Sequence, residues 1–283
     1  KSLADKTNVS LLINTGTATI VCNNDALNSI YQQAENWQVI ITVKAVTDHK
    51  LPPEIQALVA HRPVYCFSVE AKNGSITGFG NRQVVVSIPY GIESAEDPNA
   101  IVVYNISDSG EITIVRSNYN TKTQNVVFRS NHFSIYAVAY NPVTFKDVSP
   151  DDVDYGAITF LAARDIVKGT GNGNFSPDKE LTRGEFITML MRAFGIKPSD
   201  EGYDEFVDVP SNAFYAGYVS EAKRLGITAG IGDNRFGGEK PLSREEMFTL
   251  LYRTLSILDE MPSRRSNLTI DTYIDSDNIS SWA

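Results

Sequence analysis

The segment Leu181-Thr182-Arg183-Gly184-Glu185 recurs sixty-one residues later as Leu242-Ser243-Arg244-Glu245-Glu246. In both copies a hydroxyl residue precedes a glutamate by three positions, and an apolar run follows. This is the pattern of a capping box, in which the hydroxyl and the glutamate satisfy backbone N–H groups at the start of a helix. Each copy therefore predicts the first turn of an amphipathic helix.

The arginine of this box is not explained by helix capping. Arg183 and Arg244 each place a positive charge in the first turn of a helix, where the helix dipole disfavours cations. The same dipole and the free N–H groups of a helix N-terminus favour an anion, and a guanidinium can bind a carboxylate through two parallel hydrogen bonds. Because both copies keep an unfavourable residue, we interpret the two arginines as candidate functional residues.

The shift of sixty-one residues aligns much more than the box. The identical pairs include Phe145 with Phe206, Asp147 with Asp208, Gly169 with Gly230, Phe175 with Phe236, Lys179 with Lys240 and Arg192 with Arg253. So many matches without a gap indicate a tandem repeat. Each copy reads as an opening Phe-x-Asp-Val, a first helix, a glycine-rich loop and a capped second helix. Because a helix pair this short cannot bury its apolar face alone, we expect the copies to pack on one another.

The boundaries of the repeats follow from this alignment. Two complete copies are predicted at residues 144–199 and 200–262, and a third begins at Tyr273-Ile274-Asp275 but is incomplete, so that 263–283 is only its start. In the second helix of the first copy, the predicted apolar stripe consists of Phe186, Met189, Leu190, Ala193 and Phe194. The loop glycines of the first copy, at positions 169, 171 and 173, are read as turn positions that need a positive φ.

Residues 1–143 are predicted to form an all-β, sandwich-like domain. Short runs rich in β-branched and aromatic residues are separated by turn residues such as Asn73-Gly74. Val84, Val86 and Ile88 alternate with other residues, as in a strand that has one buried face. Two short helices are expected at 25–33 and 53–60. The expected architecture is therefore multi-domain, with all-α helix–loop–helix repeats after the β domain.

Composition excludes several classes of function. With 42% hydrophobic and 21% charged residues, the 283-residue chain resembles an ordinary globular protein with more than one domain. Residues 144–283 contain 15 basic and 23 acidic residues, a net charge of −8, which argues against nucleic acid as a partner. No apolar run is long enough for a membrane span. The two cysteines and three histidines lack metal-ligand spacing, so neither a metal nor a cofactor is expected.

One tripeptide, His132-Phe133-Ser134, matches the cleavage sequence of some self-cleaving domains. In those domains the serine hydroxyl attacks the preceding carbonyl across a strained turn, and the histidine acts as the base. Cleavage here would fall between Phe133 and Ser134, with His132 as the base. We favour an ordinary hairpin in which Phe133 packs into the core, because a three-residue motif is a weak signal.

Three stretches of the second half together carry a family resemblance. They are the opening Phe-x-Asp-Val, the loop Gly169–Asp178, which reads Gly-x-Gly-x-Gly-Asn-Phe-Ser-Pro-Asp, and the Leu-Thr-Arg-Gly-Glu box. From Thr144 to Ala283 the chain resembles the S-layer homology (SLH) domain of bacterial cell-surface proteins. The first half is similar to the β domain that often precedes these repeats, through Val84–Tyr90, Asp97–Tyr104 and Asn131–Val138.

The resemblance implies non-covalent anchoring of a surface protein to the cell wall. Three such repeats typically form a bundle whose grooves hold secondary cell wall polysaccharide, often capped by a pyruvylated and hence anionic sugar. It also implies a secreted, extracellular protein of the wall or S-layer, with other surface-layer proteins as further partners. The candidate ligand-binding residues are the box arginines, the opening aspartates and the lysines before the boxes: Arg183, Arg244, Asp147, Asp208, Lys179 and Lys240.

Alternatives stay open for these residues and for the chain. Each arginine could instead form a salt bridge to the opening aspartate, and the lysines could lie in a solvated loop. Glu245 puts an acid beside Arg244 in the second box, so we expect Arg183 to be the stronger ligand contact. Self-processing at His132-Phe133-Ser134 and glycan hydrolysis are the alternatives to anchoring, but hydrolysis lacks a paired-carboxylate constellation. We expect a protein that is not an enzyme.

Overall fold

The computed structural model of the chain divides it into two compact units, Lys1–Phe175 and Ser176–Ala283. It describes residues 10–282 except 36–37, 48–50, 52, 54–55, 57–58, 81, 108, 201–205, 263–268, 270–271, 273 and 275. Tyr273 and Asp275 of the predicted opening of the third copy, and half of the helix predicted at 53–60, therefore lie outside the described residues. The division between the units falls inside the first predicted repeat.

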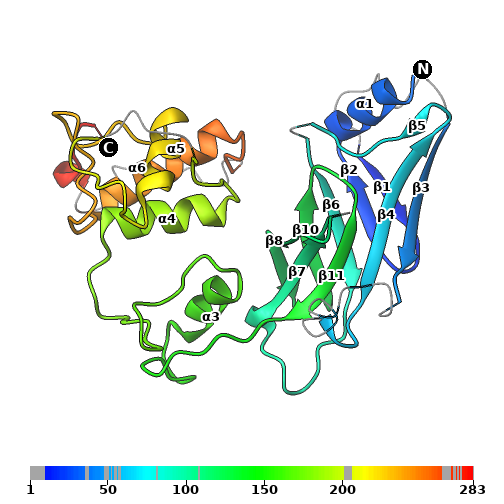
Figure 1. The fold of residues 1–283 in the computed structure, drawn as a ribbon, viewed down its shortest axis with the longest axis horizontal. Helices are drawn as coiled ribbons and strands as arrows, with labels where there is room; N and C mark the ends of the chain where they lie inside the picture. The colour runs from blue at the N-terminus through cyan, green and yellow to red at the C-terminus, as the bar shows by residue number, and fades with distance from the viewer. Residues whose placement is uncertain are drawn as a thin grey trace. The chain divides into compact units, whose positions relative to one another are not determined.

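The first unit is built on two antiparallel sheets (Figure 1). One has the strand order β1 (Leu11–Asn14), β2 (Thr19–Cys22), β6 (Val84–Pro89), β10 (Asn125–Ser130) and β9 (Ser117–Asn120). The other has the order β3 (Val39–Ala45), β4 (Val64–Ala71), β11 (Ile135–Tyr140), β7 (Ile101–Ile106) and β8 (Ile112–Val115), with β5 (Gly74–Ser75) paired to β4. The predicted all-β, sandwich-like region is confirmed.

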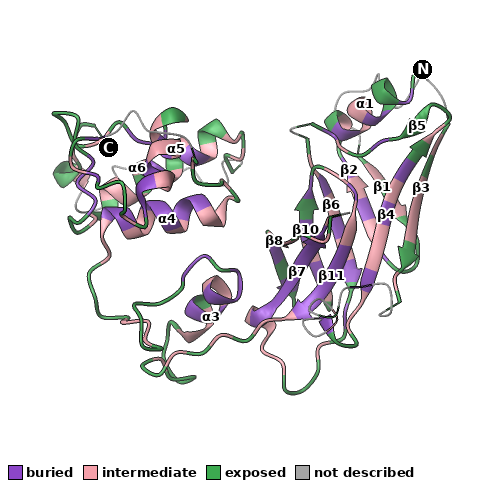
Figure 2. Ribbon diagram, in the orientation of Figure 1, coloured by how far each residue is buried: buried purple, intermediate pink, exposed green. Residues whose placement is uncertain are grey.

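The core of this unit lies between the two sheets. Buried residues alternate along β2, β6 and β10, whereas β7 is buried along its whole length (Figure 2). In β6, Val84, Val86 and Ile88 are fully buried, as their alternation predicts. Aromatic side chains from both sheets meet in the centre. Phe128 of β10 lies 4.7 Å from Tyr136 of β11, measured between ring centroids. Burial of such large rings is a main source of stability for a sandwich.

The predicted helix at 25–33 is confirmed as α1 (Asn24–Gln33). Asn23 caps it, since its side chain accepts a hydrogen bond from the Ala26 N–H at 2.9 Å. A short 3₁₀ turn, η3 (Pro98–Ala100), precedes β7. Both cysteines are free thiols, with Cys22 buried and Cys66 partly buried.

The first helix of the first repeat, α3 (Tyr155–Ala163), packs on this β unit. Arg164, directly after α3, is buried and donates to three carbonyls of the β region, those of Asn99 (2.8 Å), Ile101 (2.8 Å) and Ser117 (3.1 Å). Burial lowers the pKa of Arg164 to about 10. The hydrogen bonds of Arg164 therefore join the end of α3 to the β region.

The second unit contains α4 (Arg183–Ala193), α5 (Ala216–Arg224), α6 (Arg244–Ile257) and the 3₁₀ turn η5 (Ser276–Asn278). Helices α4 and α6 begin at the two boxes, and both predicted capping boxes are complete. In α4, the Thr182 hydroxyl accepts from the Glu185 N–H at 3.2 Å, and the Glu185 carboxylate accepts from the Thr182 N–H at 2.9 Å. The loop glycines predicted to need a positive φ all have one, at 75° for Gly169 and 105° and 81° for the next two.

Helix α4 of the first copy packs on α5 and α6 of the second, as the repeat predicts. The predicted stripe of α4 is only partly right. Leu190 is buried as predicted, but Ile187 and Met191 are fully buried while Phe186 and Met189 are half-buried. The reason is that the second copy covers the side of α4 that continues from Arg183 and Gly184, so the buried face is rotated from the predicted one.

Gly184 allows this close packing, because the ring of Tyr215 lies directly against it. A Cβ atom on Gly184 would lie 2.5 Å from Cδ1 of Tyr215, and one on Gly238 would lie 2.6 Å from its Cζ. Real Cβ atoms do not approach carbon atoms that closely. The Tyr215 ring is buried, and its hydroxyl donates to Glu239 at 2.8 Å, so it has little room to move.

We predict that Gly184→Ala destabilises the second unit by about 1–3 kcal/mol, because it forces a methyl group against the Tyr215 ring. Helix propensity alone would predict the opposite effect on stability, because it favours alanine over glycine by about 1 kcal/mol. The matched control is Gly156→Ala, also at the second position of a helix, where the nearest atom is the Asn99 side-chain amide nitrogen at 3.2 Å. Urea unfolding measures how far each substitution lowers the unfolding midpoint of the chain. If Gly184→Ala lowers the midpoint no more than Gly156→Ala does, the close contact with Tyr215 is contradicted.

Candidate functional site

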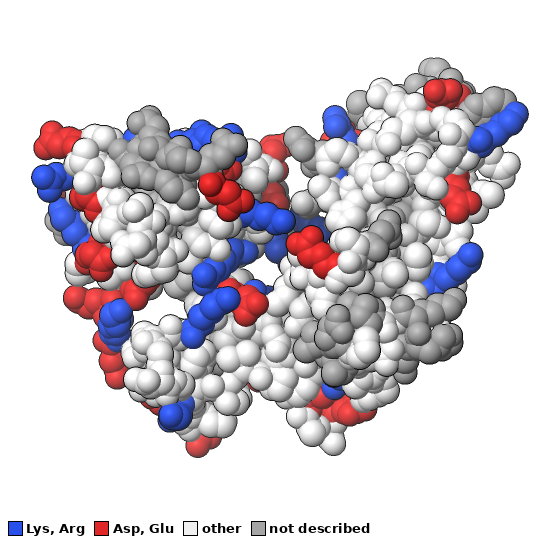
Figure 3. Space-filling model, in the orientation of Figure 1, with Lys and Arg blue, Asp and Glu red and all other residues white. Residues whose placement is uncertain are grey.

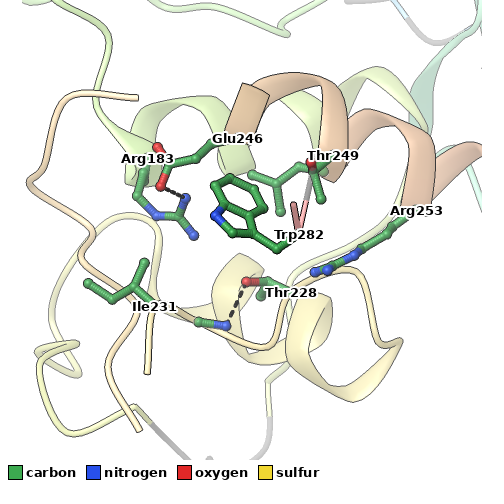
Figure 4. A pocket seen from close by; sticks show the side chains of 9 residues that line it. Arg183, Thr228, Ile231, Glu246, Thr249, Arg253 and Trp282 are labelled. Atoms are coloured by element: carbon green, nitrogen blue, oxygen red, sulfur yellow. Dashed lines mark hydrogen bonds and ion pairs between the residues drawn. The ribbon is translucent and has the colours of Figure 1, made fainter. Parts of the chain in front are cut away.

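A pocket of about 320 Å³ lies in the second unit (Figure 4). Its lining comes from the start of α4, the loop after α5, one side of α6 and the start of the third copy. The lining residues are Arg183, Thr228, Gly230, Ile231, Glu246, Thr249, Leu250, Arg253 and Trp282. Figure 4 shows Trp282 at the centre of this group, with Arg183 and Arg253 on opposite sides of it. Side chains of the two complete copies and of the segment predicted to begin a third therefore meet at one pocket.

Arg183 is the most deeply buried charged group of the lining, with 4% of the residue exposed. Its Nε donates to the Phe236 carbonyl at 3.0 Å, and its Nη1 lies 2.9 Å from Oε1 of Glu246. The guanidinium also lies over the Phe236 ring, 5.1 Å from the centroid. Burial lowers the pKa of Arg183, and the Glu246 carboxylate counteracts this effect. The arginine is thus held by the second copy.

The loop that holds Arg183 is itself held by Asp208. The two carboxylate oxygens of Asp208 accept from the N–H groups of Phe236 at 2.7 Å and Gly237 at 2.9 Å. In the first unit, the aligned Asp147 likewise accepts from the Phe175 N–H at 2.8 Å. In both copies the opening aspartate therefore orders the glycine-rich loop. Its predicted contact with a sugar stays a prediction.

The pocket combines charge, hydroxyl groups and an aromatic face. Its two arginines and one glutamate give the lining a net charge of +1. Thr228 accepts from the Gly230 N–H at 3.1 Å, whereas the buried Thr249 hydroxyl has no hydrogen-bond partner among the residues that the structure describes. Trp282 is 54% exposed. A ring this accessible beside charged and hydroxyl groups suits a sugar, which presents both C–H and O–H groups.

The structure places the six predicted binding residues in different environments. Only Arg183 lines the described pocket. Arg244 and Lys240 are exposed, and Lys179 pairs with the capping Glu185 at 2.7 Å. The ion-pair partner of Arg183 is Glu246, not the opening aspartate that the alternative named. For Arg244 and the lysines, ligand binding stays a prediction.

One expectation about the helix start is wrong. The first N–H groups of α4 were expected to be free for an anion, but those of Arg183 and Gly184 donate to the carbonyls of Lys240 (3.0 Å) and Gly238 (2.8 Å). The reason is that the second copy's loop runs across the end of the helix. The positive charge that a ligand can reach in this pocket therefore belongs to side chains.

Sequence reasoning missed four polar residues of the lining: Thr228, Glu246, Thr249 and Arg253. Glu246 was interpreted as a helix cap alone. The sequence did single out Arg253, because the repeat alignment pairs it with an identical residue, Arg192. Arg192 itself donates to the Tyr218 hydroxyl at 3.2 Å. No local pattern points to the threonines, which become part of a site only when the copies pack.

The tripeptide considered for self-cleavage lies just before β11. The Ser134 hydroxyl donates to the Ile106 carbonyl at 2.9 Å, and Nδ1 of His132 lies 2.9 Å from the Asn131 side-chain oxygen. Within the described chain, no hydrogen bond joins His132 to Ser134, and Phe133 is buried as expected. The expected hairpin is wrong, because β10 and β11 on either side of the tripeptide belong to different sheets. Self-cleavage stays a prediction, which the mass of the purified chain tests.

The described part of the chain has neither a metal-binding cluster nor a membrane-spanning helix. No group of three or more His, Cys, Asp or Glu side chains is arranged to hold a metal ion there. None of the described helices is long and apolar enough to cross a membrane.

Fold and pocket together define a tandem helical binding module joined to a β domain, and comparison with known proteins assigns its family. The S-layer homology domain model matches residues 144–187 and 205–248. The chain is 29% identical over 275 residues to an amylopullulanase of Thermoanaerobacterium thermosulfurigenes, covering 96% of this chain and 14% of that protein. It is 31% identical over 134 residues to a surface layer protein of Brevibacillus choshinensis (44% of this chain, 12% of that protein). It is also 31% identical over 114 residues to S-layer protein sap of Bacillus anthracis (40% and 14%).

The chain therefore carries two S-layer homology domains, which follow the β region. Domains of this family anchor surface proteins to the cell wall, and the chain is associated with the cell surface. The predicted family, fold class and location are confirmed. The chain spans less than a fifth of the length of each of these three relatives.

We predict that Asp208→Asn destabilises the second unit by about 2 kcal/mol at neutral pH, because an amide oxygen is a weaker acceptor for two backbone N–H groups. Burial raises the pKa of Asp208, but the N–H donors of Phe236 and Gly237 outweigh this effect and lower it. The stabilisation is therefore present above the unfolded value of about 4 and is lost as pH falls through the lower folded pKa.

Urea unfolding from pH 2 to pH 7 measures this effect. The variant should lose the steepest part of the acid limb, whereas Asp233→Asn, in an exposed loop of the same unit, should not. An unchanged acid limb in Asp208→Asn would contradict the assigned role.

Proposed function

We propose that the pocket of the second unit binds an anionic, pyruvylated sugar of secondary cell wall polysaccharide, and that this binding anchors the protein to the wall. The observation that carries the proposal is a buried guanidinium in the pocket wall beside an exposed indole. A pyruvate ketal supplies the carboxylate for Arg183, and the sugar ring supplies the C–H face for Trp282. Thr228 and Thr249 also line the pocket.

The size of the pocket fits a short ligand. About 320 Å³ lies near the lower end of the range of roughly 300–1,000 Å³ that is typical of small-molecule sites. This volume suits one sugar unit, and the rest of the polymer then extends into solvent. Terminal sugars of a wall polymer meet this requirement.

The charge of the pocket supports an anionic ligand despite the charge of the chain. The chain carries a net −9, and acidic and basic side chains are interspersed on the face drawn in Figure 3. The lining, by contrast, has a net charge of +1 and lies partly out of water. An ion pair in such a site is screened less than one on an open surface.

In this proposal the chain binds glycan and does not cleave it. The pocket lining has one carboxylate, that of Glu246, whereas glycoside hydrolysis ordinarily uses a pair. Some relatives are named as enzymes, among them the amylopullulanase, but the chain corresponds to 14% of that protein. We infer that the wall is the main partner of this chain, with neighbouring surface-layer proteins as further ones.

We predict that Arg183→Ala lowers the affinity for cell wall sacculi at least tenfold, because the buried cation that meets the carboxylate is lost. Lys179→Ala is the matched control, since Lys179 lies outside the pocket lining and pairs with Glu185. Binding is measured by co-sedimentation with purified sacculi, before and after removal of the pyruvylated polymer. The melting temperature of each variant is measured in parallel, because Arg183 also joins the two copies.

Three results would contradict the proposal. They are equal binding of the unmodified chain to stripped and intact walls, unchanged binding by a folded Arg183→Ala variant, and an equal loss in Lys179→Ala. A conservative Arg183→Lys variant separates binding from folding, since it keeps the charge but cannot form the forked contact.

A further inference from the structure

Glu246 contacts two different groups of the second unit. As the third residue of α6, it completes the capping box, since its Oε2 accepts from the Ser243 N–H at 3.0 Å. Its other oxygen, Oε1, lies 2.9 Å from Nη1 of Arg183. The side chain is 21% exposed, compared with 5% for that of Arg183. Glu246 therefore presents a carboxylate at the wall of the pocket, on the arginine that the anionic ligand is proposed to use (Figure 4).

The first capping box shows that helix capping does not require this arrangement. Glu185 occupies the same position in α4 and caps it in the same way, but its second contact is with Lys179, at 2.7 Å. Lys179 has a 52% exposed side chain, and neither residue lines the pocket. The aligned lysine of the second copy, Lys240, is exposed. The contact of Glu246 with Arg183 is thus a property of this pocket and not of capping boxes in general.

This contact limits what a ligand can do. A carboxylate binds a guanidinium best through two parallel hydrogen bonds from adjacent nitrogens. Nε of Arg183 already donates to the Phe236 carbonyl, and Nη1 already faces Glu246. An incoming carboxylate must displace Glu246 or bind beside it, and in either case it approaches another negative charge in a partly buried site.

We propose that Glu246 is a resident carboxylate that sets the affinity and charge selectivity of the pocket. In the free protein it holds and neutralises Arg183, so that a buried cation is never left unpaired. In the complex it opposes the ligand's charge and weakens the binding of anionic sugars. The inference rests on the proposed function, because it names a further specificity-determining residue of the same pocket.

The test compares Glu246→Gln with Glu185→Gln, its matched control. Glutamine keeps a capping-box side chain in both helices, but only the first change alters the charge of the pocket, from +1 to +2. The probes are a monosaccharide that carries a pyruvate ketal and the same sugar without the ketal, titrated by calorimetry into the full chain. We expect Glu246→Gln to bind the ketal sugar on the order of tenfold more tightly, with a gain that shrinks as salt is added.

Three further measurements show whether the gain comes from the charge of Glu246 or from a change in the shape of the pocket. The sugar without the ketal should bind Glu246→Gln and the unmodified chain equally, and Glu185→Gln should match the unmodified chain for both probes. Glu246→Asp keeps the charge and should show no gain. If the glutamine variant melts at a much lower temperature, Glu246→Ala, which also removes the carboxylate, must show the same gain.

Two outcomes distinguish this inference from the proposed function. If the unmodified chain binds both sugars equally, the proposed function fails. If it prefers the ketal sugar but Glu246→Gln binds that sugar no more tightly, the role of Glu246 is overturned, and the glutamate only positions Arg183.

Discussion

One side chain, Arg183, links the packing of the two copies to the pocket. It belongs to the first copy, but its hydrogen-bond and ion-pair partners, Phe236 and Glu246, belong to the second. A guanidinium this deeply buried costs several kcal/mol if it is left unpaired, so α4, the loop and α6 must assemble together. The same contacts shape one wall of the pocket. Assembly of the copies and formation of the candidate site therefore have a common physical cause.

The local features of this fold could be predicted from the sequence, whereas the partners of its charged residues could not. The capping boxes at Thr182 and Ser243 formed as predicted, because a cap depends on residues three positions apart. The choice between Lys179 and Arg183 as partner of a capping glutamate depends on how the copies pack. Glu185 takes the lysine and Glu246 takes the arginine, although the two boxes are nearly alike. The sequence pattern of a capping box therefore cannot predict which cation its glutamate contacts.

Arg164 shows the same limit in the first unit. Its aligned residue in the second copy is Leu225, so the sequence marks a difference between the copies but not its reason. The reason is a set of carbonyls on Asn99, Ile101 and Ser117, which lie 47 to 65 residues before Arg164 in the sequence and beside it in the fold. The first helix of the first repeat consequently belongs to the compact unit of the β domain. Sequence repeats and compact units do not coincide in this protein.

The central claim is that an anionic wall sugar binds at Arg183 beside Trp282. Side-chain ¹⁵N–¹H NMR during titration with a pyruvate-ketal monosaccharide tests it most directly, because each arginine Nε–H and each indole N–H gives its own signal. The account predicts that the signals of Arg183 and Trp282 shift together and saturate at the same ligand concentration. The signal of Arg224, which pairs with Glu221 and lies outside the pocket lining, should stay in place. Shifts confined to other residues, or none at Arg183, would contradict the account.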